Sequence, residues 1–187
     1  MCSHVCPWWG GYFIDNRLRR LIHNPQRILS PYVRAGMRTM DFGCGMGMFA
    51  IGMAELVGDA GLVIAVDLQE QMLATLRRRA KRAGVECRIR THRCRTDSIG
   101  LDETVDFTLA SFSVHEVPDT ERLIREIHDC LRPQGQFLII EPIVHVSSKA
   151  FARTLEIAGA TGLNVVERPR VRMCHAALLV RGEEPIA

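Results

Sequence analysis

The stretch MDFGCGMGMF, residues 40–49, places Gly43, Gly45 and Gly47 at alternate positions, two residues after Asp41. Fixing a glycine costs more backbone entropy than fixing any other residue, so this cluster indicates a chain that turns sharply or passes close to a ligand. The apolar run before it, residues 37–42, is typical of a buried strand. A glycine-rich loop after the first strand of a parallel sheet predicts a cofactor site at the carboxyl ends of the strands.

The rest of the chain alternates between strand-like and helical patterns. Apolar runs typical of strands lie at 37–42, 62–67, 86–91, 104–111, 136–141, 163–168 and 175–181. Helical patterns lie between them, over 69–83, after Asp119 or Thr120, and after Ser147 or Ser148, and the polar residues before the last two are suited to cap the helix. This alternation predicts an α/β fold with helices on both faces of a mostly parallel sheet. The last two runs are too close for a helical crossover, so we expect a hairpin and an antiparallel final strand.

Length and composition predict one intracellular domain. The 187 residues suffice for a single core, and we divide them into an N-terminal cap segment, 1–36, and a domain over 37–182. The net charge of +3 is too small to indicate nucleic-acid binding. The chain has no apolar run near 18 residues and no signal-peptide pattern, which predicts a cytoplasmic protein that does not cross a membrane. Seven cysteines without a CxxC pair predict reduced thiols.

Three carboxylates around the glycine loop indicate which ligand it binds. The G-x-G-x-x-G pattern of nicotinamide dinucleotide sites fails at Met48, and Asp41 suits a cationic amine better than a pyrophosphate. Asp67 ends the strand LVIAVD, where it can accept hydrogen bonds from ribose hydroxyls, and Asp97 follows the third strand, where it can accept from an adenine amine. An amine, a ribose and an adenine without phosphates describe S-adenosylmethionine.

Over about residues 20–182 the chain resembles the class I S-adenosylmethionine-dependent methyltransferases of the small-molecule type. The matching segments are MDFGCGMG, VIAVDLQEQML, VDFTLASFSVHEVPD, LRPQGQFLIIEP and the closing hairpin. The resemblance implies a Rossmann-like seven-stranded sheet of order 3-2-1-4-5-7-6 with strand 7 antiparallel. It also implies the cofactor contacts: the methionine part at Asp41, Gly43, Gly45 and Gly47, the ribose at Asp67 and Leu68, the adenine at Asp97 and Ser98, and the amino group at Ser111. One departure is Pro133-Gln134-Gly135, where the family has Pro-Gly-Gly.

The methyl acceptor is less clearly indicated. Oxygen and nitrogen acceptors need a base, and His115 with Glu116, just past strand 4, is the predicted catalytic pair; a thiolate or metalloid acceptor needs no base. Related nucleic-acid amino-methyltransferases carry an Asn/Asp-Pro-Pro-aromatic motif after strand 4, and we place Asp106-Phe107-Thr108-Leu109 at that position. We therefore expect a small-molecule acceptor and no nucleic acid.

Several histidines and cysteines are also predicted to gather at the cofactor edge. They are His4, Cys6, His115, His145, Cys174 and His175, with Glu141 at the end of strand 5. In one interpretation a subset binds a transition metal or a metalloid, since thiolates and imidazoles are preferred ligands of soft metals. In the other, His115 is a base and the rest are scattered core or rim residues. A non-catalytic protein that binds S-adenosylmethionine and a metal is the alternative function.

Overall fold

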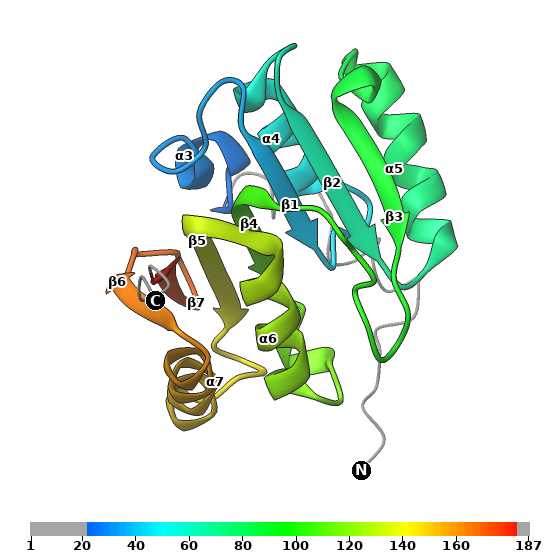
Figure 1. Ribbon diagram of the computed structural model, residues 1–187. Coiled ribbons are helices and arrows are strands. Elements are labelled where there is room, and N and C mark those ends of the chain that lie inside the picture. The colour runs from blue at the N-terminus through cyan, green and yellow to red at the C-terminus, as the bar shows by residue number, and fades with distance from the viewer. Residues whose placement is uncertain (1–21, 183–187) are drawn as a thin grey trace.

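The computed structural model describes residues 22–182, and within them seven strands form one sheet (Figure 1). The strands are β1 Arg38–Phe42, β2 Leu62–Asp67, β3 Ile89–Arg93, β4 Val105–Ser111, β5 Leu131–Pro142, β6 Leu163–Glu167 and β7 Cys174–Arg181. Their order is β3-β2-β1-β4-β5-β7-β6, and β7 pairs antiparallel with both β5 and β6. The fold predicted from the sequence is confirmed, including the closing hairpin.

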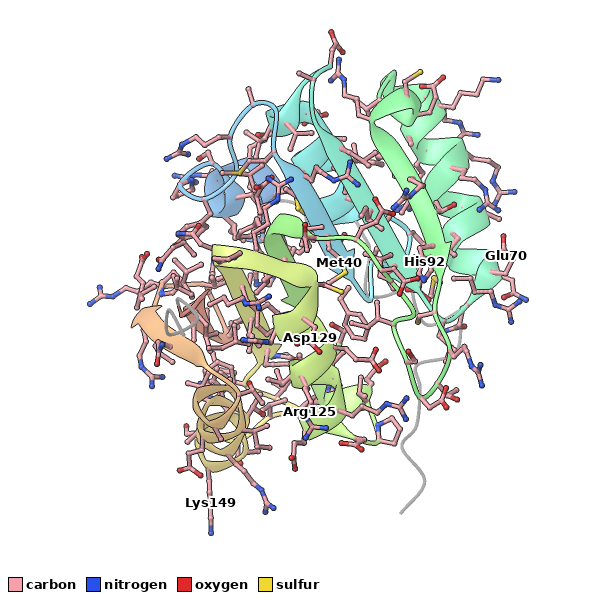
Figure 2. The ribbon with its side chains drawn as sticks, viewed as in Figure 1. Met40, Glu70, His92, Arg125, Asp129 and Lys149 are labelled. Carbon is pink, nitrogen blue, oxygen red and sulfur yellow. The ribbon has the colours of Figure 1, made fainter. Side chains whose placement is uncertain are left out.

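Helices cover both faces of this sheet. The helices α3 Pro25–Leu29, α4 Met48–Val57 and α5 Glu70–Ala83 lie on one face, and α6 Thr120–Cys130 and α7 Ser148–Ala160 lie on the other (Figure 1). Each face has its own cluster of buried apolar side chains, with Met40 in one and Leu109 in the other. Met40 lies inside the molecule, whereas Glu70 and Lys149 project from α5 and α7 (Figure 2).

Local sequence signals fix where two helices begin. The Asp119 carboxylate accepts a hydrogen bond from the backbone N–H of Arg122 at 2.9 Å, which caps α6. The Ser147 hydroxyl accepts from the N–H of Ala150 at 3.2 Å and caps α7 in the same way. The sequence left Asp119 or Thr120, and Ser147 or Ser148, as possible caps, and the first residue of each pair is the one observed.

Two strands differ from their predicted positions. A 3₁₀ turn, η1 Glu86–Arg88, occupies the start of the predicted third strand, so β3 begins only at Ile89. Strand β5 begins at Leu131, five residues early, and includes the Pro133-Gln134-Gly135 segment. Gln134 takes a positive φ of 62°, so it adopts the left-handed conformation that the family gives to a glycine.

Strand β6 forms one edge of the sheet and is irregular. Its pairing with β7 shifts register between Val165 and Glu167, so Val166 lies in a β-bulge. Of the predicted cap segment, 1–36, only residues from 22 onward lie in the described range. Within 22–182, no helix is both long enough and apolar enough to cross a bilayer.

Candidate active site

A cavity of about 470 Å³ opens at the carboxyl ends of β1, β2 and β4. It is lined by the glycine loop after β1, the loops after β2 and β3, the segment after β4 and the first turns of α6. Its lining includes these predicted cofactor residues: Asp41, Gly43, Gly45, Asp67, Leu68, Asp97, Ser98 and Ser111. Parallel strands place their carboxyl ends together at one edge, which is why residues as far apart in sequence as Asp41 and Ser111 meet here.

Each of the three glycines in the loop is required for a different structural reason. A Cβ on Gly43 would lie 2.4 Å from Cβ of Ser113, so this position requires the absence of a side chain. Gly47 caps α4 at φ 87°, and a Cβ there would lie 2.6 Å from Cγ of Leu76; it does not line the cavity. Gly45 has φ 52°, and a Cβ added there would meet nothing within 4 Å, so its backbone faces open space in the cavity. Gly45 is thus the glycine best placed to let a ligand approach the main chain.

Asp67 joins the glycine loop to the end of β2. Its carboxylate accepts hydrogen bonds from the N–H groups of Gly45 and Gln69, both at 2.9 Å. Burial raises the pKa of Asp67, and the backbone donors oppose that rise. Each carboxylate oxygen has two lone pairs, so the group can still accept from a ligand hydroxyl. Asp41 is 2% exposed and lines the same cavity, which gives this end a second buried carboxylate suited to a cationic amine.

The loop after β3 is held by a residue that the sequence did not indicate. The Glu126 carboxylate, on α6, accepts from the N–H of Ile99 at 2.5 Å and from the Ser98 hydroxyl at 3.2 Å. His92 Nε2 bonds to the Ile99 carbonyl oxygen at 2.7 Å from the other side. Asp97 remains exposed at the cavity wall. The predicted adenine-binding loop is therefore fixed from two elements.

The last residue of β4 and the residue after it place a polar and an aromatic side chain beside the cavity. The Ser111 hydroxyl oxygen is buried at the cavity wall without a hydrogen-bond partner among residues 22–182. Phe112 has φ 63°, which is unfavourable for a residue with a large side chain, and this residue also lines the cavity. An unsatisfied buried hydroxyl and a strained backbone at one place are typical of a functional site.

His115 lies on the turn η2 Val114–Glu116 and is bonded to a buried carboxylate. Its Nδ1–H donates to Oε2 of Glu141, a residue 2% exposed at the end of β5, while Oε1 accepts from the N–H of Val114 at 2.9 Å. The hydrogen bond to Glu141 raises the pKa of His115, partly offset by burial. Because a carboxylate can only accept, Nδ1 carries the proton and Nε2 of the neutral ring is left as a base.

The predicted pair of His115 and Glu116 divides between two surfaces. Glu116 lines the cavity, whereas His115 lies outside its lining, beside the loop that follows β5. There its ring meets that of His145, with ring centroids 5.8 Å apart and planes nearly perpendicular. The carboxylate partner of His115 is Glu141 rather than Glu116. The sequence placed Glu141 at this edge without indicating its contact.

The predicted metal ligands are only partly brought together. Successive residues of a strand point to opposite faces, and this separates Cys174 from His175. The ring of His175 stacks on that of Phe151 in α7, whereas Cys174 Sγ lies 3.4 Å from Nε2 of His23. His23, which the sequence analysis did not include among these residues, is buried. His4 and Cys6 lie outside the described residues. Within residues 22–182, no three His, Cys, Asp or Glu side chains form a group that could hold a metal.

The cysteine in the glycine loop is a packing residue. Cys44 is 8% exposed and belongs to the apolar cluster under α4. Burial, followed by the charges of Asp41 and Asp67, raises the pKa of its thiol well above the usual range. A thiol in that environment stays protonated and is a poor nucleophile. The cysteines in the described range are all free thiols.

One sequence comparison needs correction. Residues Asp106–Leu109 lie inside β4, because they pair with β1 and β5, so they do not follow strand 4. The segment that follows β4 is Phe112-Ser113-Val114-His115, which also lacks the two prolines of the nucleic-acid motif. The inference drawn from the missing motif is unchanged.

Known proteins resemble this chain in sequence. The model of a methyltransferase domain family matches residues 39–135, just over half of the chain. The chain is 29% identical, over 123 residues, to the ubiquinone/menaquinone biosynthesis C-methyltransferases UbiE of Enterobacter sp. (strain 638) and Escherichia coli (strain K12 / DH10B). That match covers 64% of this chain and 49% of each relative, so the chain spans about half the length of the curated relatives it matches.

Solved structures share the fold at lower identity. A SAM-dependent methyltransferase from Aquifex aeolicus superposes with a TM-score of 0.84 at 23% identity, over 94% of this chain and 98% of that one. A putative S-adenosyl-L-methionine-dependent methyltransferase from Methanococcus maripaludis has a TM-score of 0.79 at 15% identity, over 98% and 97%. The family match shows that the chain belongs to the methyltransferase domain family. Together with the sheet order, it shows that the chain has the fold of a class I S-adenosylmethionine-dependent methyltransferase.

Proposed function

We propose that the protein transfers the methyl group of S-adenosylmethionine to a small-molecule acceptor. The observation that carries this proposal is the cavity, which combines the open backbone of Gly45, the buried Asp41 carboxylate and the unsatisfied Ser111 hydroxyl. These groups suit a ligand with a cationic amine and no phosphate. S-adenosylmethionine supplies a methyl group bound to a positively charged sulfur, which is open to attack by a nucleophile.

In this proposal the described residues bind the cofactor in three parts. Asp41, Ser111 and the backbone around Gly43 and Gly45 hold the methionine part. Asp67 and Leu68 hold the ribose, and Asp97 with Ser98 holds the adenine. Support comes from the position of all these residues on one cavity. Gly47 acts indirectly, because it begins α4 and lets Leu76 pack against the loop.

We further propose that His115 removes a proton from the acceptor, with Glu141 as its positioning residue. The hydrogen bond to Glu141 fixes the ring and stabilises the imidazolium that forms when the base takes up a proton. A thiolate or a metalloid needs no base, so this pair favours a carbon or oxygen acceptor that must lose a proton. The printed name of the UbiE relatives, a C-methyltransferase, is consistent with an acceptor of this kind. Glu116 then faces the cofactor cavity.

The test combines binding with turnover. Calorimetry should show that the protein binds S-adenosylhomocysteine and ignores NAD, and a panel of phenols, enols, thiols and amines should yield S-adenosylhomocysteine from S-adenosylmethionine with at least one acceptor. Binding of NAD in place of S-adenosylhomocysteine would overturn the cofactor assignment.

The role of His115 predicts a pH dependence that can be checked separately. Because Glu141 raises the pKa of His115, the rate should rise with pH through a midpoint above the usual histidine value of about 6.5. Glu141→Gln should lower that midpoint, since it removes the charge that holds the proton on the ring. An identical pH profile in the two proteins would mean that His115 is not the base.

A further inference from the structure

An exposed apolar cluster lies beside the proposed base. Among residues 22–182, five large apolar side chains are exposed, and three of them gather after β5 and before β7: Ile143 at 48%, Val144 at 72% and Met173 at 57%. The two loops are joined by a hydrogen bond from the N–H of Ile143 to the carbonyl oxygen of Met173 at 3.1 Å. Contiguous apolar surface on a folded protein marks a place where something else binds.

The backbone at this cluster is strained. Met173 adopts a positive φ of 58°, in the left-handed region that is unfavourable for a residue with a side chain. The turn that holds it is closed by the N–H of Cys174 donating to the carbonyl oxygen of Val171 at 3.1 Å. The side chain of Met173 is exposed in this turn, although burying it would be favourable.

The cluster is flanked by positive charge. In the β6–β7 loop the arginines Arg168, Arg170 and Arg172 are exposed and alternate with Pro169 and Val171, which are partly buried. The ion pairs of the described range include none of these three arginines, whereas many other arginines of the molecule are paired with carboxylates. An unpaired guanidinium fork is suited to bind a carboxylate or a similar anion.

This surface is continuous with the proposed catalytic pair. His145 directly follows Val144, and its ring contacts that of His115, which bonds to Glu141. Glu141 in turn lies opposite His175 in the pairing of β5 with β7. A molecule lying on the apolar cluster would therefore border the base and the carboxyl end of β5.

We infer that Ile143, Val144, Met173 and the three arginines, together called the acceptor platform, bind a methyl acceptor with an apolar body and an anionic group. This inference rests on the proposed methyl transfer and names the class of acceptor for it. Charge argues against two other occupants. Residues 1–21 carry three arginines and one aspartate, and a second copy of the chain would bring the same arginines to the interface.

The experiment uses the full chain saturated with S-adenosylhomocysteine and two probes of similar shape, 2-naphthoate and the neutral 2-naphthamide. We expect 2-naphthoate to bind more tightly than 2-naphthamide. Arg170→Gln/Arg172→Gln should weaken 2-naphthoate roughly three- to tenfold and leave 2-naphthamide almost unchanged. Val144→Asp should weaken both probes. The matched controls are Arg82→Gln, an exposed cation on α5, and Val166→Asp, an exposed valine on the edge strand β6.

Three results would overturn the inference. The first is equal binding of the two probes, or no binding of 2-naphthoate. The second is that Val144→Asp leaves the affinity for 2-naphthoate unchanged but lowers the free energy of unfolding of the protein. That result would mean that residues 1–21 cover the apolar cluster. The third is a shift from dimer to monomer in Val144→Asp, measured by sedimentation, which would assign it to a second copy. Binding of S-adenosylhomocysteine, measured in the same samples, reports on the proposed function independently.

Discussion

Asp67 stabilises the loop and binds the ligand with the same carboxylate, because it accepts from the N–H groups of Gly45 and Gln69 while it lines the cavity. We predict that Asp67→Ala weakens S-adenosylhomocysteine binding by about 1 to 3 kcal/mol, the range for losing a charged hydrogen-bond acceptor. Calorimetry measures the change. Asp59→Ala is the control, because its carboxylate is exposed and pairs with Arg88. An unchanged affinity in Asp67→Ala would place the ribose elsewhere.

The pair of His115 and Glu141 should also contribute to stability in a pH-dependent way. Glu141 raises the pKa of folded His115, so the stabilisation is fully present below the unfolded histidine pKa of about 6.5 and is lost as pH rises through the folded value. His115→Gln should therefore lower the free energy of unfolding more at about pH 5.5 than at about pH 9. Chemical denaturation at the two pH values measures this difference. In a Glu141→Gln background the extra loss at low pH should disappear.

At the scale of single residues, the sequence predicted the groups that stand next to a strand end and missed those that act across the fold. Asp41 and Asp67 were singled out because each lies within the last two residues of a strand that precedes a loop. Glu126 and His23 reach their partners over separations of 27 and 149 residues, so no local pattern indicates them. Cys174 and His175 point away from each other because successive residues of a strand face opposite sides of the sheet. The order of the strands, from which their position was predicted, does not report this.

The glycine loop can be tested as an element with a matched pair of substitutions. Gly45 and Gly36 both have positive φ, 52° and 81°, and open space around a Cβ, but only Gly45 lines the cavity. Gly45→Ala and Gly36→Ala should each lower the free energy of unfolding by about 1 kcal/mol, the cost of the left-handed conformation. Only Gly45→Ala should also weaken S-adenosylhomocysteine binding in calorimetry. Equal affinities in the two variants would show that the cofactor does not approach Gly45.

Element positions followed from the sequence where the pattern and the caps agreed. The helix expected at 69–83 is observed as Glu70–Ala83, and it ends at Gly84 in the left-handed conformation. The third and fifth strands differed because their boundaries depend on contacts that periodicity does not report. Val85 is buried below η1 and delays β3, and the positive φ of Gln134 lets the chain pair with β4 before the expected start of β5.

For the whole molecule, the order of the strands in the sheet followed from the order of the motifs in the sequence. The apolar clusters on the two faces pack against the same seven strands, so we predict one cooperative thermal transition. S-adenosylhomocysteine at about 100 times its dissociation constant should add about 2.7 kcal/mol, which for a chain of this length raises the midpoint by roughly 5 to 10 °C. Scanning calorimetry checks both statements. Two separate transitions would show that the faces unfold independently, and Asp67→Ala should reduce the shift.

The bulge at Val166 has a consequence for how the molecule behaves at high concentration. A sheet that ends in a regular strand offers a row of unpaired amide and carbonyl groups that a neighbouring chain can extend, and Val165 and Val166 are exposed on this one. The shift in register between Val165 and Glu167 bends the strand and interrupts that row, while Glu167 and Arg168 place charges at its end. The irregularity of this edge strand therefore disfavours edge-to-edge pairing of the sheets of two molecules.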